Sequence, residues 1–167
     1  AQGHAVGSSL YEPDQVPIVK ALLKKAKEKK QRIVIPTDVV VAPSLSLQSI
    51  PAVKAVHEVR AQDKILDVGP HTTTRYEGIL TEAKTVIWNG PVGAFEYPAF
   101  SQGTLLLAKM VAESDAYSLV GGGETVAAIE KARLVDYISY LSTGGSAFLA
   151  YCEGNSLPAI VALENKN

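Results

Sequence analysis

The chain has 167 residues, of which 47% are hydrophobic and 20% charged, and its formal net charge is −1. A chain of this length can bury one good core, and the balanced charge provides no broad basic field to attract nucleic acid or an anionic membrane. The single cysteine cannot form an internal disulfide, and no apolar run reaches the ~18 residues that could span a bilayer. These features predict one compact domain in a reducing, cytoplasmic compartment, with neither nucleic acid nor a membrane as partner.

The opening residues, AQGHAVGSSLYEPD, have no initiating Met and no basic region followed by an apolar one, so they read as the interior of a longer sequence. In the first half, apolar and lysine residues alternate at helical spacing, and short apolar runs end at Gly or Pro. The pattern predicts a helix over 14–30 with Asp14 as its cap, and strands over 32–36, 53–59 and 64–70.

From residue 71 onward, strand-like and helix-like segments alternate clearly. Such alternation is typical of a parallel sheet covered by helices. We therefore predict an α/β fold with a parallel sheet and helices on both faces, Rossmann-like and doubly wound. The predicted helices are 72–83 (with Thr caps), 100–113, 124–132 and 146–153, and the predicted strands are 85–88, 116–120 and 137–141.

Each of three glycine-rich loops follows one of these predicted strands. They are WNGPVGAFE (88–96), VGGGETV (120–126) and LSTGGSAF (141–148). Ligands of open parallel sheets gather at the carboxyl ends of the strands, where glycines admit a ligand to the backbone and helix N-termini favour anions. Any one loop alone is as readily a tight turn, but three together favour a phosphate site. None is a Walker A loop or a G-x-G-x-x-G dinucleotide motif.

These loops, followed by EGNSLPA (153–159), closely resemble the C-terminal part of the phosphoglycerate kinase family. GHAVGSSLYE (3–12), IPTDVVVA (35–42) and LDVGP (66–70) support the resemblance, which runs through the chain in the family's order. The resemblance implies that residues 1–167 are a partial C-terminal, nucleotide-binding domain, incomplete at the N-terminal end of its fold. It also implies that the N-terminal, triose-binding domain is absent.

The resemblance implies a glycolytic kinase that transfers a phosphoryl group between 1,3-bisphosphoglycerate and ADP, giving 3-phosphoglycerate and ATP. Magnesium would be the cofactor and ATP or ADP the substrate nucleotide. The missing N-terminal segment of the same enzyme would be the partner of this chain.

Nucleoside contacts are implied at four residues. Asn89 matches a position that contacts the nucleotide phosphates, Pro91 one that lies against the nucleoside, and Glu96 one that accepts hydrogen bonds from the ribose hydroxyls. A carboxylate has two acceptor oxygens for two adjacent hydroxyl donors, which agrees with that role. Leu66 matches the edge of the adenine pocket, and an ordinary core position is an equally open interpretation.

Phosphoryl contacts are implied in the second loop. The amides of Gly121, Gly122 and Gly123 would face the transferring group, and Thr125 would contact a nucleotide phosphate. Glu124 stands where the family usually has Asp as a magnesium ligand, and its extra methylene would shift the carboxylate in an octahedral site. An acidic residue favoured by the helix dipole in the first turn is the alternative interpretation of Glu124, and the side chain could serve both roles.

The third loop would face the triose. Ser142, Thr143, Gly144 and Gly145 match a segment that meets the triose-side phosphate when the domains close. Ser146 replaces a third glycine, where its Cβ narrows the backbone approach and its hydroxyl could act as an N-cap.

The cations of the family site have no counterpart in this sequence. Family members use lysines early in the nucleotide domain and an arginine from the N-terminal domain, and such donors are worth several powers of ten in rate. We therefore expect little or no kinase activity from this polypeptide alone. A non-catalytic nucleotide-binding or scaffold polypeptide derived from the family is the alternative interpretation.

Overall fold

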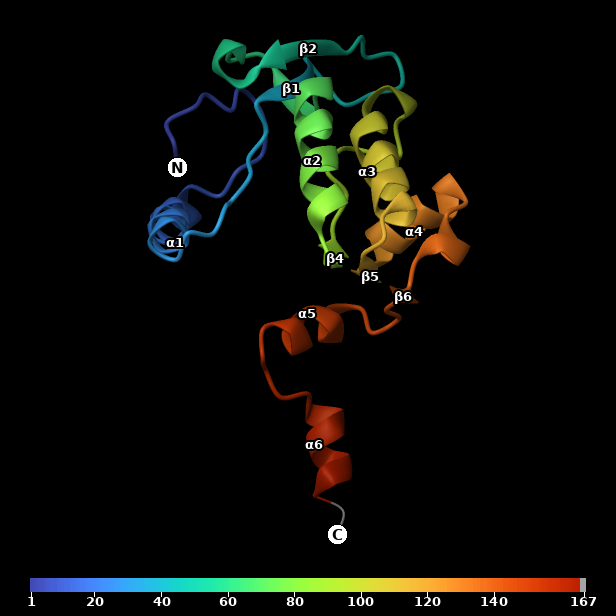
Figure 1. Ribbon diagram of the computed structural model, residues 1–167. Helices are drawn as coiled ribbons and strands as arrows, with labels where there is room; N and C mark the ends of the chain where they lie inside the picture. The colour runs from blue at the N-terminus through green and yellow to red at the C-terminus, as the bar shows by residue number, and fades with distance from the viewer. Residues whose placement is uncertain (166–167) are drawn as a thin grey trace. The chain divides into compact units, whose positions relative to one another are not determined.

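The computed structural model describes residues 1–165 (Figure 1). The chain divides into two compact units, one formed by Ala1–Arg75 with Val92–Gly103 and the other by Tyr76–Pro91 with Thr104 onward. Within the described residues, no helix is both long enough and apolar enough to cross a bilayer.

The first unit is built on an antiparallel sheet of order β2-β1-β3. Its strands are β1 (Asp38–Ala42), β2 (Ala52–Ala55) and β3 (Lys64–Val68). Val39 and Val41 lie on one face of β1 and form a small core with Val59. The predicted strand over 32–36 is wrong, because that segment pairs with no strand and the ladder begins at Asp38 instead.

The basic helix α1 (Val16–Glu28) follows a short 3₁₀ turn, η1 (Pro13–Gln15). Its N-cap is Gln15, with no side-chain bond, so the prediction that Asp14 caps this helix is wrong. No residue of α1 is buried, and Ile18 and Leu22 are each more than half exposed. The apolar face of this helix is therefore uncovered by the rest of the described chain.

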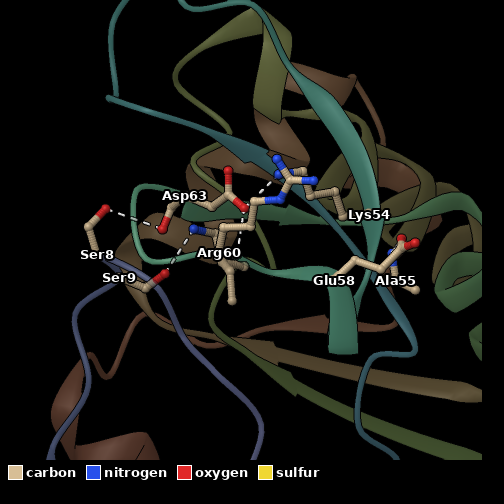
Figure 2. Close-up of polar contacts among 8 residues, drawn as sticks. Ser8, Ser9, Lys54, Ala55, Glu58, Arg60 and Asp63 are labelled. Atoms are coloured by element: carbon tan, nitrogen blue, oxygen red, sulfur yellow. Dashed lines mark hydrogen bonds and ion pairs between the residues drawn. The ribbon is translucent and has the colours of Figure 1, made fainter.

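The N-terminal segment is hydrogen-bonded to Asp63 and to the start of β3 (Figure 2). The Ser8 amide donates to the Asp63 carbonyl at 2.8 Å, and the Ser9 hydroxyl accepts from a β3 amide at 2.8 Å. The buried Asp63 carboxylate accepts from Lys54 Nζ at 2.6 Å and from the Arg60 amide at 2.7 Å. These two hydrogen bonds lower the pKa of Asp63 below its ordinary value. One acidic residue thus orders the loop between β2 and β3.

The carboxylate of Asp38 caps the N-terminus of helix α2 (Pro70–Glu82). That carboxylate accepts from the amides of His71 at 3.0 Å and Thr72 at 2.8 Å, and the Thr72 hydroxyl lies 2.6 Å away. Burial raises the pKa of Asp38, but the Thr72 hydroxyl and the two amides outweigh it, so the pKa lies below its ordinary value. The cap is therefore an aspartate 34 residues upstream of Thr72, and the predicted Thr caps are wrong.

The second unit contains a parallel sheet of order β4-β5-β6, which confirms the predicted parallel α/β fold. Trp88 and Val120 lie in its core with Ala108, Val111 and Ile129 from two helices. The strands are β4 (Thr85–Asn89), β5 (Tyr117–Gly121) and β6 (Tyr140–Leu141), and the helices are α3 (Gln102–Glu113), α4 (Gly123–Ala132), α5 (Ser146–Cys152) and α6 (Pro158–Glu164).

Three further 3₁₀ turns connect these elements: η2 (Val56–Glu58), η3 (Pro98–Phe100) and η4 (Val135–Tyr137). Turns η2 and η4 replace parts of two predicted strands. The strand predicted over 53–59 ends at Ala55, and the one predicted over 137–141 is limited to two residues.

An apolar cavity of about 590 Å³ lies against the face of this sheet that carries Ile87. Leu119 and Tyr140 contribute from the other two strands, and Phe148 and Tyr151 contribute from α5. Ile87 and Tyr140 keep more than half of their surfaces exposed. No charged side chain of the described residues lines this cavity.

Candidate functional site

The carboxyl ends of β4 and β5 lie in register, with Asn89 opposite Gly121. The Asn89 side-chain amide donates to the Gly121 carbonyl at 2.8 Å, and the Gly90 amide donates to the Thr125 hydroxyl oxygen at 2.7 Å. The loop after β4 is thereby joined to both the end of β5 and the first turn of α4. The Trp88 indole N–H donates to the Gly90 carbonyl at 2.7 Å and stabilises the same loop.

Two glycines after β5 allow this arrangement. A Cβ at Gly121 would overlap the ring of Phe148, so only glycine lets α5 pack directly on β5. Gly122 has φ +94, a backbone conformation that residues with a Cβ rarely adopt. A Cβ at Gly122 would also lie 2.7 Å from Asn89 Nδ2. The GGG run therefore has a packing role at its first residue and a conformational role at its second.

The start of α4 presents free backbone donors. Gly122 is the N-cap and has no side-chain bond to the helix. The first amides of an α-helix have no acceptor within the helix, and the helix dipole places partial positive charge beside them. Glu124 is exposed in this first turn. This end of the helix is therefore suited to an anion, with one carboxylate at its edge.

All three glycine-rich loops line one open pocket of about 260 Å³. Most ligand pockets occupy roughly 300–1,000 Å³, so this one suits a phosphate-sized group better than a whole nucleotide. Its lining contains no lysine or arginine among the described residues. The lining residues are Asn89, Gly90, Gly122, Gly123, Glu124, Thr125, Gly145, Ser146 and Leu149.

Six residues predicted from the sequence share this pocket: Asn89, Gly122, Gly123, Glu124, Thr125 and Gly145. Gly121 is not among the lining residues and lies against Phe148, and Ser142 and Gly144 line the apolar cavity instead. Thr143 is exposed, and Pro91 is half-buried outside both linings. Ser146 is the first residue of α5, whose N-cap is Gly145, so the expectation that its hydroxyl caps the helix is wrong.

Leu66 and Glu96 belong to the first unit. Leu66 is buried with Ala42 and Phe100, which supports the interpretation of this side chain as core. Its carbonyl accepts from the Ala94 amide at 2.9 Å and so holds the segment that leads to Glu96. Glu96 itself is exposed. An adenine contact for Leu66 and a ribose contact for Glu96 remain predictions.

Asp67 is a buried residue to which the sequence assigned no role. Its carboxylate accepts from the amides of Gly103 and Val68, each at 2.8 Å. Burial raises the pKa of Asp67, and these two hydrogen bonds only partly oppose that effect. The sequence signal for a role of Asp67 was its place inside the apolar run ILDV. A charged side chain is costly to bury there unless it has hydrogen-bond partners.

The pocket offers one carboxylate to a metal ion. No three His, Cys, Asp or Glu side chains gather into a metal site anywhere in the described part of the chain. Magnesium, however, is usually held by only one or two carboxylates together with substrate phosphates and waters. Glu124 beside a phosphate-sized pocket therefore fits a magnesium ion that arrives with a nucleotide.

The chain is similar to known proteins over most of its length. The family model described as phosphoglycerate kinase matches residues 1–155. A phosphoglycerate kinase of Nitratidesulfovibrio vulgaris (strain DSM 19637 / Miyazaki F) is 50% identical over all 167 residues. The chain spans 42% of the length of that relative.

Two solved structures show the same likeness. Phosphoglycerate kinase from Coxiella burnetii matches 95% of this chain with a TM-score of 0.92 and 46% identity. Phosphoglycerate kinase from Pyrococcus horikoshii OT3 matches 98% of it with a TM-score of 0.75 and 29% identity. In both cases the match covers 41% of the solved chain.

Proposed function

The chain belongs to the phosphoglycerate kinase family, and from this premise we propose that it forms the nucleotide-phosphate part of a phosphotransferase. The reaction is transfer of a phosphoryl group between 1,3-bisphosphoglycerate and ADP, which gives 3-phosphoglycerate and ATP in glycolysis. The observation that carries the proposal is the pocket shared by the three glycine-rich loops.

The pocket would act on phosphates through backbone groups. The uncapped amides at the start of α4 donate toward the anion, and the helix dipole adds positive potential. Phosphoryl transfer relies mainly on positioning and charge stabilisation, so fixed donors of this kind contribute directly. The bonds from Asn89 to Gly121 and from Gly90 to Thr125 fix those donors before the nucleotide binds.

Thr125 has a double role in this proposal. Its hydroxyl oxygen accepts from Gly90, and its hydroxyl proton can still be donated to a phosphate oxygen. Glu124 would hold magnesium, which would neutralise phosphate charge when bound. The remaining assignments, Pro91 and Glu96 to the nucleoside and the 142–145 loop to the triose-side phosphate, belong to the same proposal.

A second function is favoured by one observation. Among the described residues that line the pocket, none carries positive charge, yet cationic groups supply a large part of the rate in phosphoryl transfer. This polypeptide by itself would then bind nucleotide phosphates without catalysing their transfer. The kinase proposal predicts that phosphoryl transfer returns when the rest of a family member is supplied. The binding-only function predicts that it does not.

The test is a full-length hybrid, in which this chain replaces the matching segment of the Nitratidesulfovibrio relative. We expect the hybrid to form ATP from 1,3-bisphosphoglycerate and ADP, and the isolated chain to form little or none. The unmodified relative serves as the positive control. A folded hybrid that forms no ATP would refute the kinase proposal and leave nucleotide binding alone.

A further inference from the structure

Asp67 is the most deeply buried carboxylate of the first unit, and the proposed chemistry does not use it. It lies in β3 and is only 2% exposed. Its two oxygens accept from different places, one from the next residue in β3 and the other from Gly103 in the first turn of α3. A buried carboxylate with two short backbone bonds is a rigid point of attachment.

The segment between β4 and α3 passes directly over this carboxylate. Gly93 lies so close to Asp67 that a Cβ at this position would overlap the carboxylate and the Phe100 carbonyl. A Cβ at Gly103 would overlap the same carboxylate from the other end of the segment. One residue later than Gly93, the Ala94 amide donates to the Leu66 carbonyl at 2.9 Å. The 93–103 segment is therefore held on β3 at both of its ends.

Glu96 lies within this held segment and is itself exposed. An exposed glutamate has several rotatable bonds, so its position depends on how firmly its backbone is held. Charge–dipole bonds from a buried carboxylate are about twice as strong as neutral ones and fix a backbone at small entropic cost. The geometry thus connects Asp67 to the placement of Glu96 through the backbone, without direct contact.

We propose that Asp67 is a positioning residue that holds the 93–103 segment on β3 and thereby presents Glu96 to the ribose hydroxyls of the nucleotide. This inference rests on the proposed function, because it requires a nucleotide whose ribose Glu96 meets. Asp67 acts on ribose selectivity and leaves the phosphate pocket of the second unit unchanged.

The test compares ADP with 2′,3′-dideoxy-ADP as substrates of the full-length hybrid. A carboxylate that accepts from ribose hydroxyls should favour ADP in kcat/KM on the order of tenfold. In Asp67→Asn the side chain keeps its size but turns an N–H₂ group toward one of two amide donors. We expect this variant to reduce the preference to about twofold or less, mainly through weaker use of ADP.

Asp63→Asn is the matched control, since Asp63 is also a buried carboxylate that accepts from a backbone amide in the same unit. Its bonds order a different loop, so this variant should lower both kcat/KM values equally and keep their ratio. A second variant, Gly93→Ala, keeps the chemistry of the carboxylate but places a methyl group against it, so the segment must move away from Asp67. It should reduce the ratio as Asp67→Asn does.

Hydrogen exchange provides a readout that needs no nucleotide. In Asp67→Asn the Ala94 amide should exchange on the order of tenfold faster than in the parent, whereas in Asp63→Asn it should not change. An active hybrid whose Asp67→Asn variant keeps the full ADP preference, or an Ala94 amide that stays protected, would overturn the role of Asp67. An inactive hybrid would instead overturn the proposed function, and the ribose role with it.

Discussion

The bond from the Gly90 amide to Thr125 is the feature of the phosphate pocket that can be perturbed most cleanly. Thr125→Val keeps the shape of the side chain and removes the oxygen that accepts this bond. Thr125 is 1% exposed, and a valine methyl group would occupy the position of its hydroxyl, so the Gly90 amide loses this acceptor. Leaving a buried donor unpaired costs about 1–3 kcal/mol, and because Gly90 is only half-buried we expect about 1–2 kcal/mol.

Urea unfolding of the chain without nucleotide is the assay. The chain has a single tryptophan, Trp88, whose indole N–H donates to the Gly90 carbonyl, so its fluorescence reports on the same loop. Thr81→Val is the matched control, because Thr81 is exposed and its hydroxyl bonds only within α2, to Glu77. The control should change the free energy of unfolding by less than about 0.5 kcal/mol.

The same substitution should weaken ADP binding by the hybrid about tenfold while adenosine binding is unaffected, since adenosine carries no phosphate. If Thr125→Val unfolds like the parent and like Thr81→Val, Gly90 does not depend on Thr125. The description of the pocket as fixed before the nucleotide binds would then be wrong.

Three further predictions concern single residues. Asp38→Ala removes the cap of α2 and should lower the free energy of unfolding by about 1–2 kcal/mol at pH 7 in urea titrations, whereas Asp14→Ala should not. Because the folded pKa of Asp38 is lowered from 3.8, its stabilisation is present above that pH and is lost as pH falls through the folded pKa. The difference in unfolding free energy between the parent and Asp38→Ala should therefore shrink in acid. A difference that stays constant with pH would contradict the role of Asp38 as the cap of α2. Gly121→Ala places a methyl group into a buried ring and should cost about 1–3 kcal/mol by thermal unfolding, while Gly123→Ala, with no atom within 4 Å, should be tolerated. In the hybrid, Glu124→Gln should raise the magnesium concentration needed for half-maximal activity at least about tenfold, and Glu124→Asp should not; equal magnesium dependence in all three proteins would exclude Glu124 as the ligand.

The second half of the fold could be predicted from the sequence because its signals are local. The strands at Thr85–Asn89 and Tyr117–Gly121 are apolar runs bounded by turn residues, and each is followed by a glycine-rich loop. Parallel strands place such loops at one edge of the sheet, so their shared pocket followed from the order of the elements. Glycine content predicted the 120–126 and 141–148 loops, whereas the roles of Glu124 and Thr125 within the pocket were implied only by the family resemblance.

The first half was predicted less well because its structure depends on distant partners. The runs at 32–36 and 38–42 have similar composition, and only pairing with β2 and β3 selects the second as a strand. The cap of α2 comes from Asp38, far upstream in the sequence, and no local pattern shows this. Helical spacing correctly predicted α1, but spacing does not reveal whether its apolar face is covered.

Asp67 shows the same limit at the candidate site. Its role depends on Gly93 and Gly103, which approach it only after the chain has folded. The LDVGP motif supports the family resemblance, but within it the resemblance implies a role for Leu66 alone. The neighbouring aspartate became visible through its burial and its two backbone bonds.

We propose that the pocket shared by the three glycine-rich loops holds the phosphates of the nucleotide. A crystal structure of the full-length hybrid with ADP and magnesium tests it most directly. We expect the terminal phosphate of ADP against the amides of Gly122 and Gly123, with the metal ion at Glu124. Phosphates bound elsewhere, with this pocket filled only by water, would contradict it.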